Sequence, residues 1–171
     1  MMRKAIFFGV AVVLLAVAAV LSFGTDRVIS RVEGNIDAPV DAVFEAIIAP
    51  EYRPKWMQYV DSTVQMSGYP GEQGALMMMM IKQEAFSVAV YEEIIGVDEP
   101  ASIRFRIQEE TADVSTLYLL EQQDGGTHLT IEAERTLKKG WAKTFAFFLR
   151  GSSEKNLQYN FTSLKRLVEA L

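Results

Sequence analysis

The chain has 171 residues, of which 50% are hydrophobic and 23% are charged, a composition typical of one folded domain and not of a disordered chain. Its 17 basic and 22 acidic residues give a formal net charge of −5, so we expect no nucleic-acid partner, because such binding needs a positive surface. The chain has no cysteine and one histidine, which excludes disulfides, cysteine nucleophiles and multi-histidine metal sites. We expect neither a metal nor a cofactor.

The first residues predict a membrane anchor. Arg3 and Lys4 precede 19 residues without charge, Ala5 to Phe23, and a helix of that length rises about 28 Å, close to the hydrocarbon core of a bilayer. Residues 1–24 are therefore predicted to be a transmembrane segment and residues 25–171 a separate domain, with a cleaved signal peptide as the alternative. Since positive flanks stay in the cytoplasm, we expect a single pass through the inner (plasma) membrane, with the domain on the periplasmic or extracytoplasmic side.

The domain begins with a strand and two short helices. Val28 to Ile36 alternates between apolar and polar residues, as a half-buried strand does. Asp37 is a candidate helix cap, and Pro39 is expected in the first helical turn. Val40 to Ile47 then has helical spacing, and Glu51 to Tyr59 is predicted to be a second short helix.

After these helices the hydrophobic period changes to two, which predicts a series of antiparallel strands. The predicted strands include residues 64–66, 76–81, 86–90, 103–107, 117–119 and 129–133. Asp124 to Gly126 indicates a tight hairpin. From Leu157 to the C-terminus apolar residues recur every three or four positions, which predicts a long amphipathic helix. That helix is expected to begin near Trp141, with Gly151 as a weak point.

The order of these elements, together with several short motifs, resembles the SRPBCC superfamily of helix-grip proteins. This superfamily includes START-like lipid-binding domains and polyketide cyclase/dehydrase-like proteins. The motifs are Ile36–Phe44, Pro50–Tyr52 with Trp56, Gly71–Gly74, Glu99–Pro100 and Asp124–Thr127. The resemblance implies an α+β helix-grip fold, in which a curved antiparallel sheet of about seven strands wraps around a long C-terminal helix. Two short helices follow the first strand, and the transmembrane helix precedes it.

The resemblance and the predicted anchor imply a membrane-tethered domain that binds a lipid-like or other hydrophobic small molecule between the sheet and the C-terminal helix. One alternative is a cyclase- or dehydrase-like enzyme that uses polar cavity residues such as Tyr91, Tyr118, Arg106 or Glu132. A second alternative is an envelope interaction protein without a ligand. We assign no catalytic residue, because a catalytic imidazole needs an orienting carboxylate and a reacting partner, whereas His128 follows a hairpin on a polar strand face.

Large apolar and aromatic side chains on the predicted strands and the long helix are the candidates to line a ligand cavity. These candidates are Met77, Met79, Val88, Tyr91, Phe105, Tyr118, Phe148 and Phe161. In the run Met77–Met80 alternate residues face opposite sides of a strand, which predicts core packing on both faces or a soft cavity wall, and disfavours a copper site. Arg104 and Arg106 either hold an anionic headgroup or form a solvated outer face. Glu92–Glu93 is expected to be surface charge.

The segment from Leu137 to Arg150 is basic and aromatic within an otherwise acidic domain. Its candidates for membrane contact are Lys138, Lys139, Trp141, Lys143 and Phe145. An interfacial segment places its rings at the headgroup boundary and its cations against anionic lipid. The alternative is that the segment opens the long helix and packs on the sheet.

Overall fold

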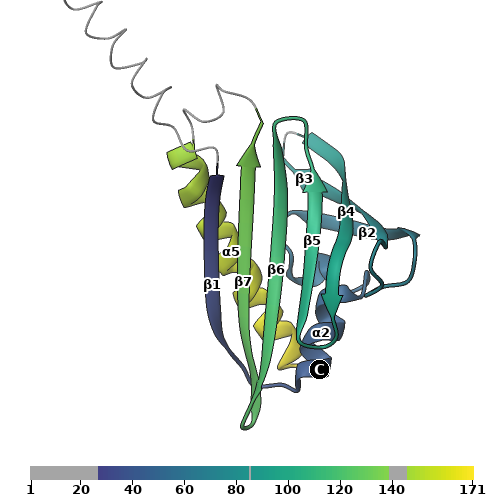
Figure 1. The fold of residues 1–171 in the computed structure, drawn as a ribbon, viewed down its shortest axis with the longest axis vertical. Helices are drawn as coiled ribbons and strands as arrows, with labels where there is room; N and C mark the ends of the chain where they lie inside the picture. The colour runs from purple at the N-terminus through teal and green to yellow at the C-terminus, as the bar shows by residue number, and fades with distance from the viewer. Residues whose placement is uncertain (1–26, 85, 139–145) are drawn as a thin grey trace, which may run out of the picture.

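A computed structural model describes residues 27–84, 86–138 and 146–171, with the side chains of 146–150 left out of the description (Figure 1). The predicted transmembrane segment at residues 1–24 lies outside the described residues. So do four of the membrane-contact candidates and the side chain of one cavity candidate, namely Lys139, Trp141, Lys143, Phe145 and Phe148. In the part of the chain that is described, no helix is both long enough and apolar enough to span a bilayer.

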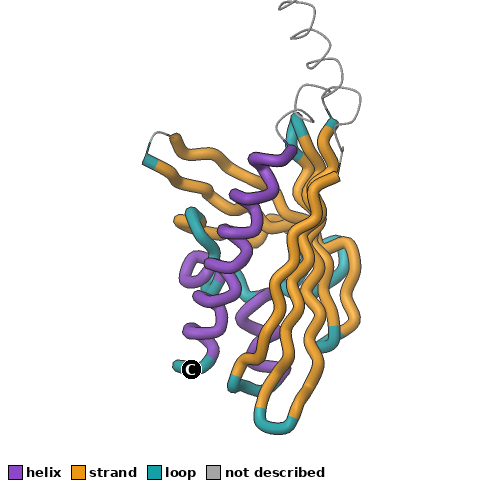
Figure 2. The backbone as a smooth tube through the Cα atoms, turned by 90° about the vertical axis from the view of Figure 1, so that its left-hand side faces the viewer, coloured by secondary structure: helices purple, strands orange, loops and turns teal. Residues whose placement is uncertain are grey.

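The described residues form an antiparallel sheet of seven strands with a long helix along its concave face (Figures 1 and 2). In chain order the elements are β1 (Arg27–Ile36), α2 (Val40–Ile48), α3 (Arg53–Trp56), β2 (Val60–Ser67), β3 (Leu76–Gln83), β4 (Phe86–Asp98), β5 (Ser102–Gln108), β6 (Ala112–Gln123), β7 (Gly126–Leu137) and α5 (Ala146–Val168). The strand order β1-β7-β6-β5-β4-β3-β2 places the first strand beside the last. This is the predicted α+β helix-grip architecture.

Local features of the strands bend the sheet around the helix. Register shifts interrupt the ladder in β4, between Ile94 and Gly96, and at two points in β2, and such bulges increase the bend and twist of a strand. The predicted hairpin joins β6 to β7 through a turn in which Gly125 has a φ of 87°, a conformation that glycine adopts without steric cost. The curved sheet therefore has a concave face on which helices can pack.

Three local predictions differ from the structure. The second short helix is only one turn, α3, because the backbone becomes extended at Met57. Asp37 does not cap the first helix: Pro39 occupies the cap position of α2 without a side-chain hydrogen bond, and the Asp37 backbone N–H donates instead to Glu169 Oε1 at 2.8 Å. Gly151 does not interrupt α5.

The main hydrophobic core fills the space between the sheet and the three helices. Val43, Phe44 and Ile47 of α2 are buried against the sheet. Trp56 of α3 is 1% exposed, and its indole N–H donates to the carbonyl of Ala46 at 2.9 Å. An indole that is both enclosed and hydrogen-bonded fixes the position of the helix that carries it.

β1 and α5 approach each other closely at a glycine. A Cβ atom added at Gly34 would lie 2.8 Å from Phe161 Cζ of α5, whereas one added at Gly96 would have no neighbour nearer than 4.0 Å. Gly34 therefore lets the helix lie directly on the edge of the sheet.

We expect Gly34→Ala to lower the free energy of unfolding by about 1–3 kcal/mol, because the added methyl group overpacks a filled contact. Gly96→Ala, measured in the same urea titration, is the matched control and should cause no such loss. Phe161→Leu should cost less in the Gly34→Ala background than in the wild type. Equal stability of the two glycine variants would contradict this account of the contact.

Candidate functional site

The inward-facing side chains divide the concave face into a closed half and an open half. Near the β6–β7 turn these side chains are buried beneath the helices. Toward the other end, the described part of α5 packs mainly against β1, and several inward-facing residues of the central strands are only half-buried, although Val28, Ala112 and Leu137 form a separate buried cluster at the far end of the sheet. The half-buried inward-facing residues of the open half include Val90, Ile107, Val114, Thr116 and Ala133, together with Arg135, which lies opposite Val114 in the β6–β7 ladder and pairs with Glu109 at 2.9 Å.

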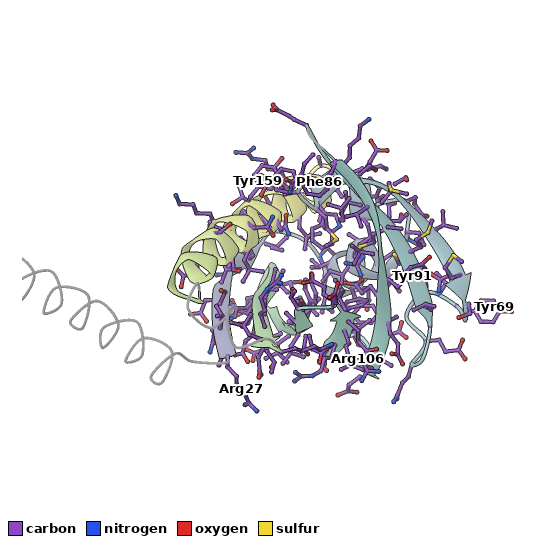
Figure 3. The ribbon with its side chains drawn as sticks, turned by 90° about the horizontal axis from the view of Figure 1, so that it is seen from above. Arg27, Tyr69, Phe86, Tyr91, Arg106 and Tyr159 are labelled. Carbon is purple, nitrogen blue, oxygen red and sulfur yellow. The ribbon has the colours of Figure 1, made fainter. Side chains whose placement is uncertain are left out.

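The β3–β4 hairpin forms one side of the open half. The first residues of β4, before Glu92, extend beyond the strand pairing with β5 (Figure 2). Phe86 and Val88 lie on the inward-facing side of this extension and are 51% and 45% exposed. Seen from above, Phe86 and Tyr159 of α5 lie on the same side of the molecule (Figure 3). Large apolar side chains exposed at inward-facing positions identify surface that is available to an apolar partner.

A buried ion pair lies where the two halves meet. Arg53 of α3 is fully buried and Glu92 of β4 is 4% exposed, and Arg53 Nη2 donates a hydrogen bond to Glu92 Oε2. Glu92 follows Val90 on the inward-facing side of β4, so it borders the open half. Burying two charges is costly unless they are paired closely and their remaining polar atoms are satisfied.

Aromatic rings surround the guanidinium group. The Arg53 Cζ atom lies 4.4 Å from the centroid of the Phe105 ring and 5.6 Å from that of the Trp56 ring, which are favourable cation–π distances. Tyr118 packs edge-on against both rings, with centroid separations of 5.7 Å to Phe105 and 6.4 Å to Trp56. The charge of Arg53 is thus held between aromatic faces.

Burial controls the ionisation of the two acidic groups in this cluster. Removal from water raises the pKa of Glu92 above its ordinary value, and the charge and hydrogen bond of Arg53 oppose that rise. Burial also raises the pKa of Tyr118, so its hydroxyl stays protonated at any physiological pH. The cluster therefore combines one cation, one carboxyl group and one neutral hydroxyl group.

A network of amide groups links α5 to Gln58, the residue directly after Met57. Asn160 Oδ1 accepts from the Gln58 backbone N–H at 2.8 Å, and Asn156 Nδ2 donates to Gln58 Oε1 at 2.9 Å. Asn160 Nδ2 in turn donates to Asn156 Oδ1 at 3.3 Å. Buried hydrogen-bond networks of this kind fix relative positions, so α3 and its Arg53 are tied to both the sheet and the long helix.

The structure buries five of the eight cavity candidates from the sequence, in two separate clusters. Phe105 and Tyr118 are buried on the inward-facing side beside Arg53, and Phe161 is buried on α5. The remaining two buried candidates, Met77 and Met79, form a second small cluster with Val60, and Met77 lies opposite Glu92 in the β3–β4 ladder. The two exposed candidates lie in different places.

Val88 is inward-facing but exposed, whereas Tyr91 lies on the convex face and is 51% exposed. The prediction that Tyr91 lines the cavity places it on the wrong face. Residues alternate between faces along β4, and the neighbouring Glu92 occupies the inward position.

Other polar candidates also lie on the convex face. Arg106 pairs with Glu93 at 2.7 Å, which matches the alternative of a solvated outer face. Glu132 alternates with the inward-facing Ile131 on β7, and His128 Nδ1 lies 2.6 Å from Asn35 Oδ1 on that outer side. Among the described residues, no group of three or more histidine, cysteine, aspartate or glutamate side chains could hold a metal ion.

Lys138 is the one membrane-contact candidate within the described residues. Its Nζ atom lies 2.7 Å from Asp113 Oδ1 and donates to the Glu109 carbonyl at 3.0 Å. An acid from the same domain therefore already balances this charge.

The sequence pattern does not reveal the ion pair, because it predicts that Glu92–Glu93 is surface charge. That expectation is wrong for Glu92, which is buried, and holds only for Glu93. The available signal was the alternation of Val88, Val90 and Ile94, in which Glu92 occupies an apolar position. A carboxylate at such a position requires a buried cation from elsewhere in the chain.

The fold and the site together describe a helix-grip domain with half-buried residues on its concave face beside a buried charged pair. The family model for polyketide cyclase/dehydrase and lipid transport matches residues 27–169. The chain therefore belongs to this family, within the SRPBCC superfamily. No curated protein sequence matches the chain.

Solved structures support the same fold. Ara h 8.0201 is 19% identical with a TM-score of 0.68, over 85% of this chain and 99% of that chain. TTHA0849 from Thermus thermophilus is 17% identical with a TM-score of 0.69, over 83% and 97%. StfQ, a di-domain ARO/CYC protein from the steffimycin biosynthetic pathway, is 12% identical with a TM-score of 0.69, over 84% of this chain and 51% of that chain. At these identities the likeness concerns the fold alone.

The ion pair generates a test of stability. Arg53→Met should lower the free energy of unfolding by about 3–5 kcal/mol, because it leaves the Glu92 carboxyl group buried without its counter-charge. The double variant Arg53→Met, Glu92→Leu removes both charges and should be much closer to the wild type in urea unfolding. If the double variant is as unstable as the single variant, the two side chains do not act as a pair.

Proposed function

We propose that the domain binds a lipid-like or other hydrophobic small molecule in the open half of the concave face. The observation that carries this proposal is that the apolar residues Val90, Ile107, Val114 and Ala133 face inward and are only half-buried. Burying them against an apolar molecule contributes roughly 25 cal/mol per Å² of surface removed from water. Membership of a family that includes lipid transport supports the same function.

A membrane tether would place this site beside its source of ligand. β1 begins at Arg27, at the end of the sheet where the open half lies (Figure 1), and the apolar run Ala5–Phe23 precedes it in the chain. An anchor of that length would hold the open half toward the bilayer, and weak binding from the bilayer would then benefit from a high effective concentration. The proposal includes a location on the extracytoplasmic side of the inner membrane.

The location can be tested with a phosphatase fused after Leu171, which is active only when exported. The basic residues Arg3 and Lys4 favour an orientation with the N-terminus in the cytoplasm, so the fusion should be active and should fractionate with membranes. A fusion that is inactive although fully expressed would overturn the proposed location without affecting the proposed binding site.

The test of ligand binding uses the full chain, purified from membranes in a non-ionic detergent and examined by native mass spectrometry. The wild type should carry a co-purifying apolar molecule or take up an added hydrophobic probe. Thr116→Trp, whose ring would project into the open half, should reduce the bound fraction at least about tenfold, a difference of roughly 1.4 kcal/mol.

Leu117→Trp is the matched control, because this neighbouring residue is also half-buried but faces the convex side. It should retain binding. Circular dichroism should show both variants folded. A wild-type chain that binds no apolar molecule would overturn the proposed function, and equal binding by the two variants would overturn its placement in the open half.

A cyclase- or dehydrase-like activity is a second candidate, favoured by one observation. Glu92 and Tyr118 are ionisable groups with shifted pKa values on the inward-facing side, and such groups are frequent at active sites. Binding remains the first proposal because Arg53 already holds the carboxyl group in an ion pair. Dehydration would appear as the loss of the mass of one water molecule from the bound molecule during incubation, and Tyr118→Phe should abolish that loss.

A further inference from the structure

The outer part of the β3–β4 hairpin exposes large apolar side chains that the proposed ligand site does not use. Phe86 and Val88, at inward-facing positions of β4, are 51% and 45% exposed. The residues Phe86–Tyr91 pair with β3 alone, because the ladder with β5 begins only at Glu92. A two-stranded hairpin is marginally stable in water unless its apolar face packs against something. These side chains are therefore a candidate contact surface.

A third large side chain lies at the base of the hairpin. The Lys82 backbone N–H donates to the Tyr59 carbonyl at 2.8 Å, and Tyr59 is 49% exposed. Tyrosine is enriched where its ring meets an apolar phase and its hydroxyl group meets water. Tyr59, Phe86 and Val88 together are called the hairpin patch.

The hairpin patch lies toward the end of the sheet at which β1 begins. The strand register carries the row of Arg27 across β7 and β6 to Gln108 of β5. In β4 the residues before Glu92 lie at or beyond this row, so Phe86 is further along in the same direction than Arg27. Figure 2 shows the tip of the hairpin at the end of the molecule where β1 begins.

The sequence before β1 indicates what this surface meets. The uncharged run Ala5–Phe23 has the length of a bilayer-spanning helix, and only Gly24–Asp26 separates it from Arg27. Three residues reach at most about 11 Å, so a run held in a bilayer keeps this end of the sheet close to the lipid headgroups. We propose that the hairpin patch inserts into the headgroup region of the bilayer that holds the N-terminal run. This inference rests on the membrane anchor in the proposed function and adds a second point of contact.

The apolar side chains, and not charge, hold the hairpin at the bilayer. Between Leu76 and Val88 the chain has one basic residue, Lys82, and one acidic residue, Glu84. The Lys82 Nζ atom also lies 3.8 Å from Asp61 Oδ1. Since the hairpin has no net positive charge to attract anionic lipid, the patch inserts into zwitterionic lipid. Screening by salt leaves such an apolar contact in place.

The test uses the full chain reconstituted in phosphatidylcholine vesicles that contain nitroxide-labelled lipid. Because the chain has no cysteine, a fluorescent dye can be attached at one chosen position. Gln83→Cys places the dye opposite Phe86 in the β3–β4 ladder, and Glu121→Cys places it on β6 near the opposite end of the sheet. The nitroxide should quench the dye at position 83 several-fold more than the dye at position 121, equally at roughly 0.05 and 0.5 M sodium chloride.

Phe86→Asp, made in the Gln83→Cys background, should reduce the quenching to the level seen at position 121, because a carboxylate is costly to remove from water. Tyr91→Asp is the matched control: Tyr91 is also 51% exposed on β4 but faces the convex side, so the quenching should persist. Circular dichroism should show both variants folded.

The outcomes separate this inference from the anchor. A chain that does not float with the vesicles would overturn both, whereas a vesicle-bound chain with an unquenched dye at position 83 overturns the inference alone. A dye that leaves water without being quenched by the nitroxide would mean that protein covers the hairpin, which also overturns it. Loss of quenching at high salt, or an equal loss in the two aspartate variants, would contradict insertion through the hairpin patch. Ligand binding in the open half is measured independently of all these outcomes.

Discussion

Two full charges are buried where α3 meets β4, and the arrangement of the interior depends on this contact. An arginine and a glutamate removed from water remain compatible with a stable fold only while they stay together. The pair therefore holds the single turn of α3 against the middle of the sheet. Trp56 on that turn is fixed by the same contact, and the amide groups of Gln58 and Asn160 extend the constraint to α5. One electrostatic contact thus sets the positions of helix, sheet and aromatic rings together.

The shape of the interior follows from how the long helix is supported. Gly34 admits Phe161 so closely that α5 lies over the edge strand β1 and not over the centre of the sheet. The central strands are covered by α2 and α3 at one end only. The hydrophobic core is consequently complete near the β6–β7 turn and incomplete near the β3–β4 hairpin. The partial burial of the inward-facing residues on the central strands is therefore a consequence of asymmetric packing.

The sequence predicted the elements of the fold better than the polar contacts between them. Alternation along β1, the hairpin at Asp124 and the spacing of the C-terminal helix are local signals, and each predicted its element. The Arg53–Glu92 pair joins residues 39 positions apart. No local pattern identifies which cation pairs with a buried carboxylate. Local patterns also did not show which face of β4 each residue occupies. Tyr91 lies on the convex face because its neighbour Glu92 is buried on the concave face. Local patterns thus did not predict the contacts between residues that are far apart in the sequence.

The alternation of the four consecutive methionines has a consequence for oxidative damage. Met77 and Met79 are 5% and 1% exposed, whereas Met78 and Met80 are half-buried on the convex face, near the 50% exposed Met66. Oxidants convert accessible thioethers to sulfoxides, which are polar and enlarge the side chain. Reagents such as peroxide would therefore modify the convex-face residues first, where a sulfoxide can remain in contact with water. Met77 and Met79 face inward and are buried, so these two methionines of β3 would be oxidised last.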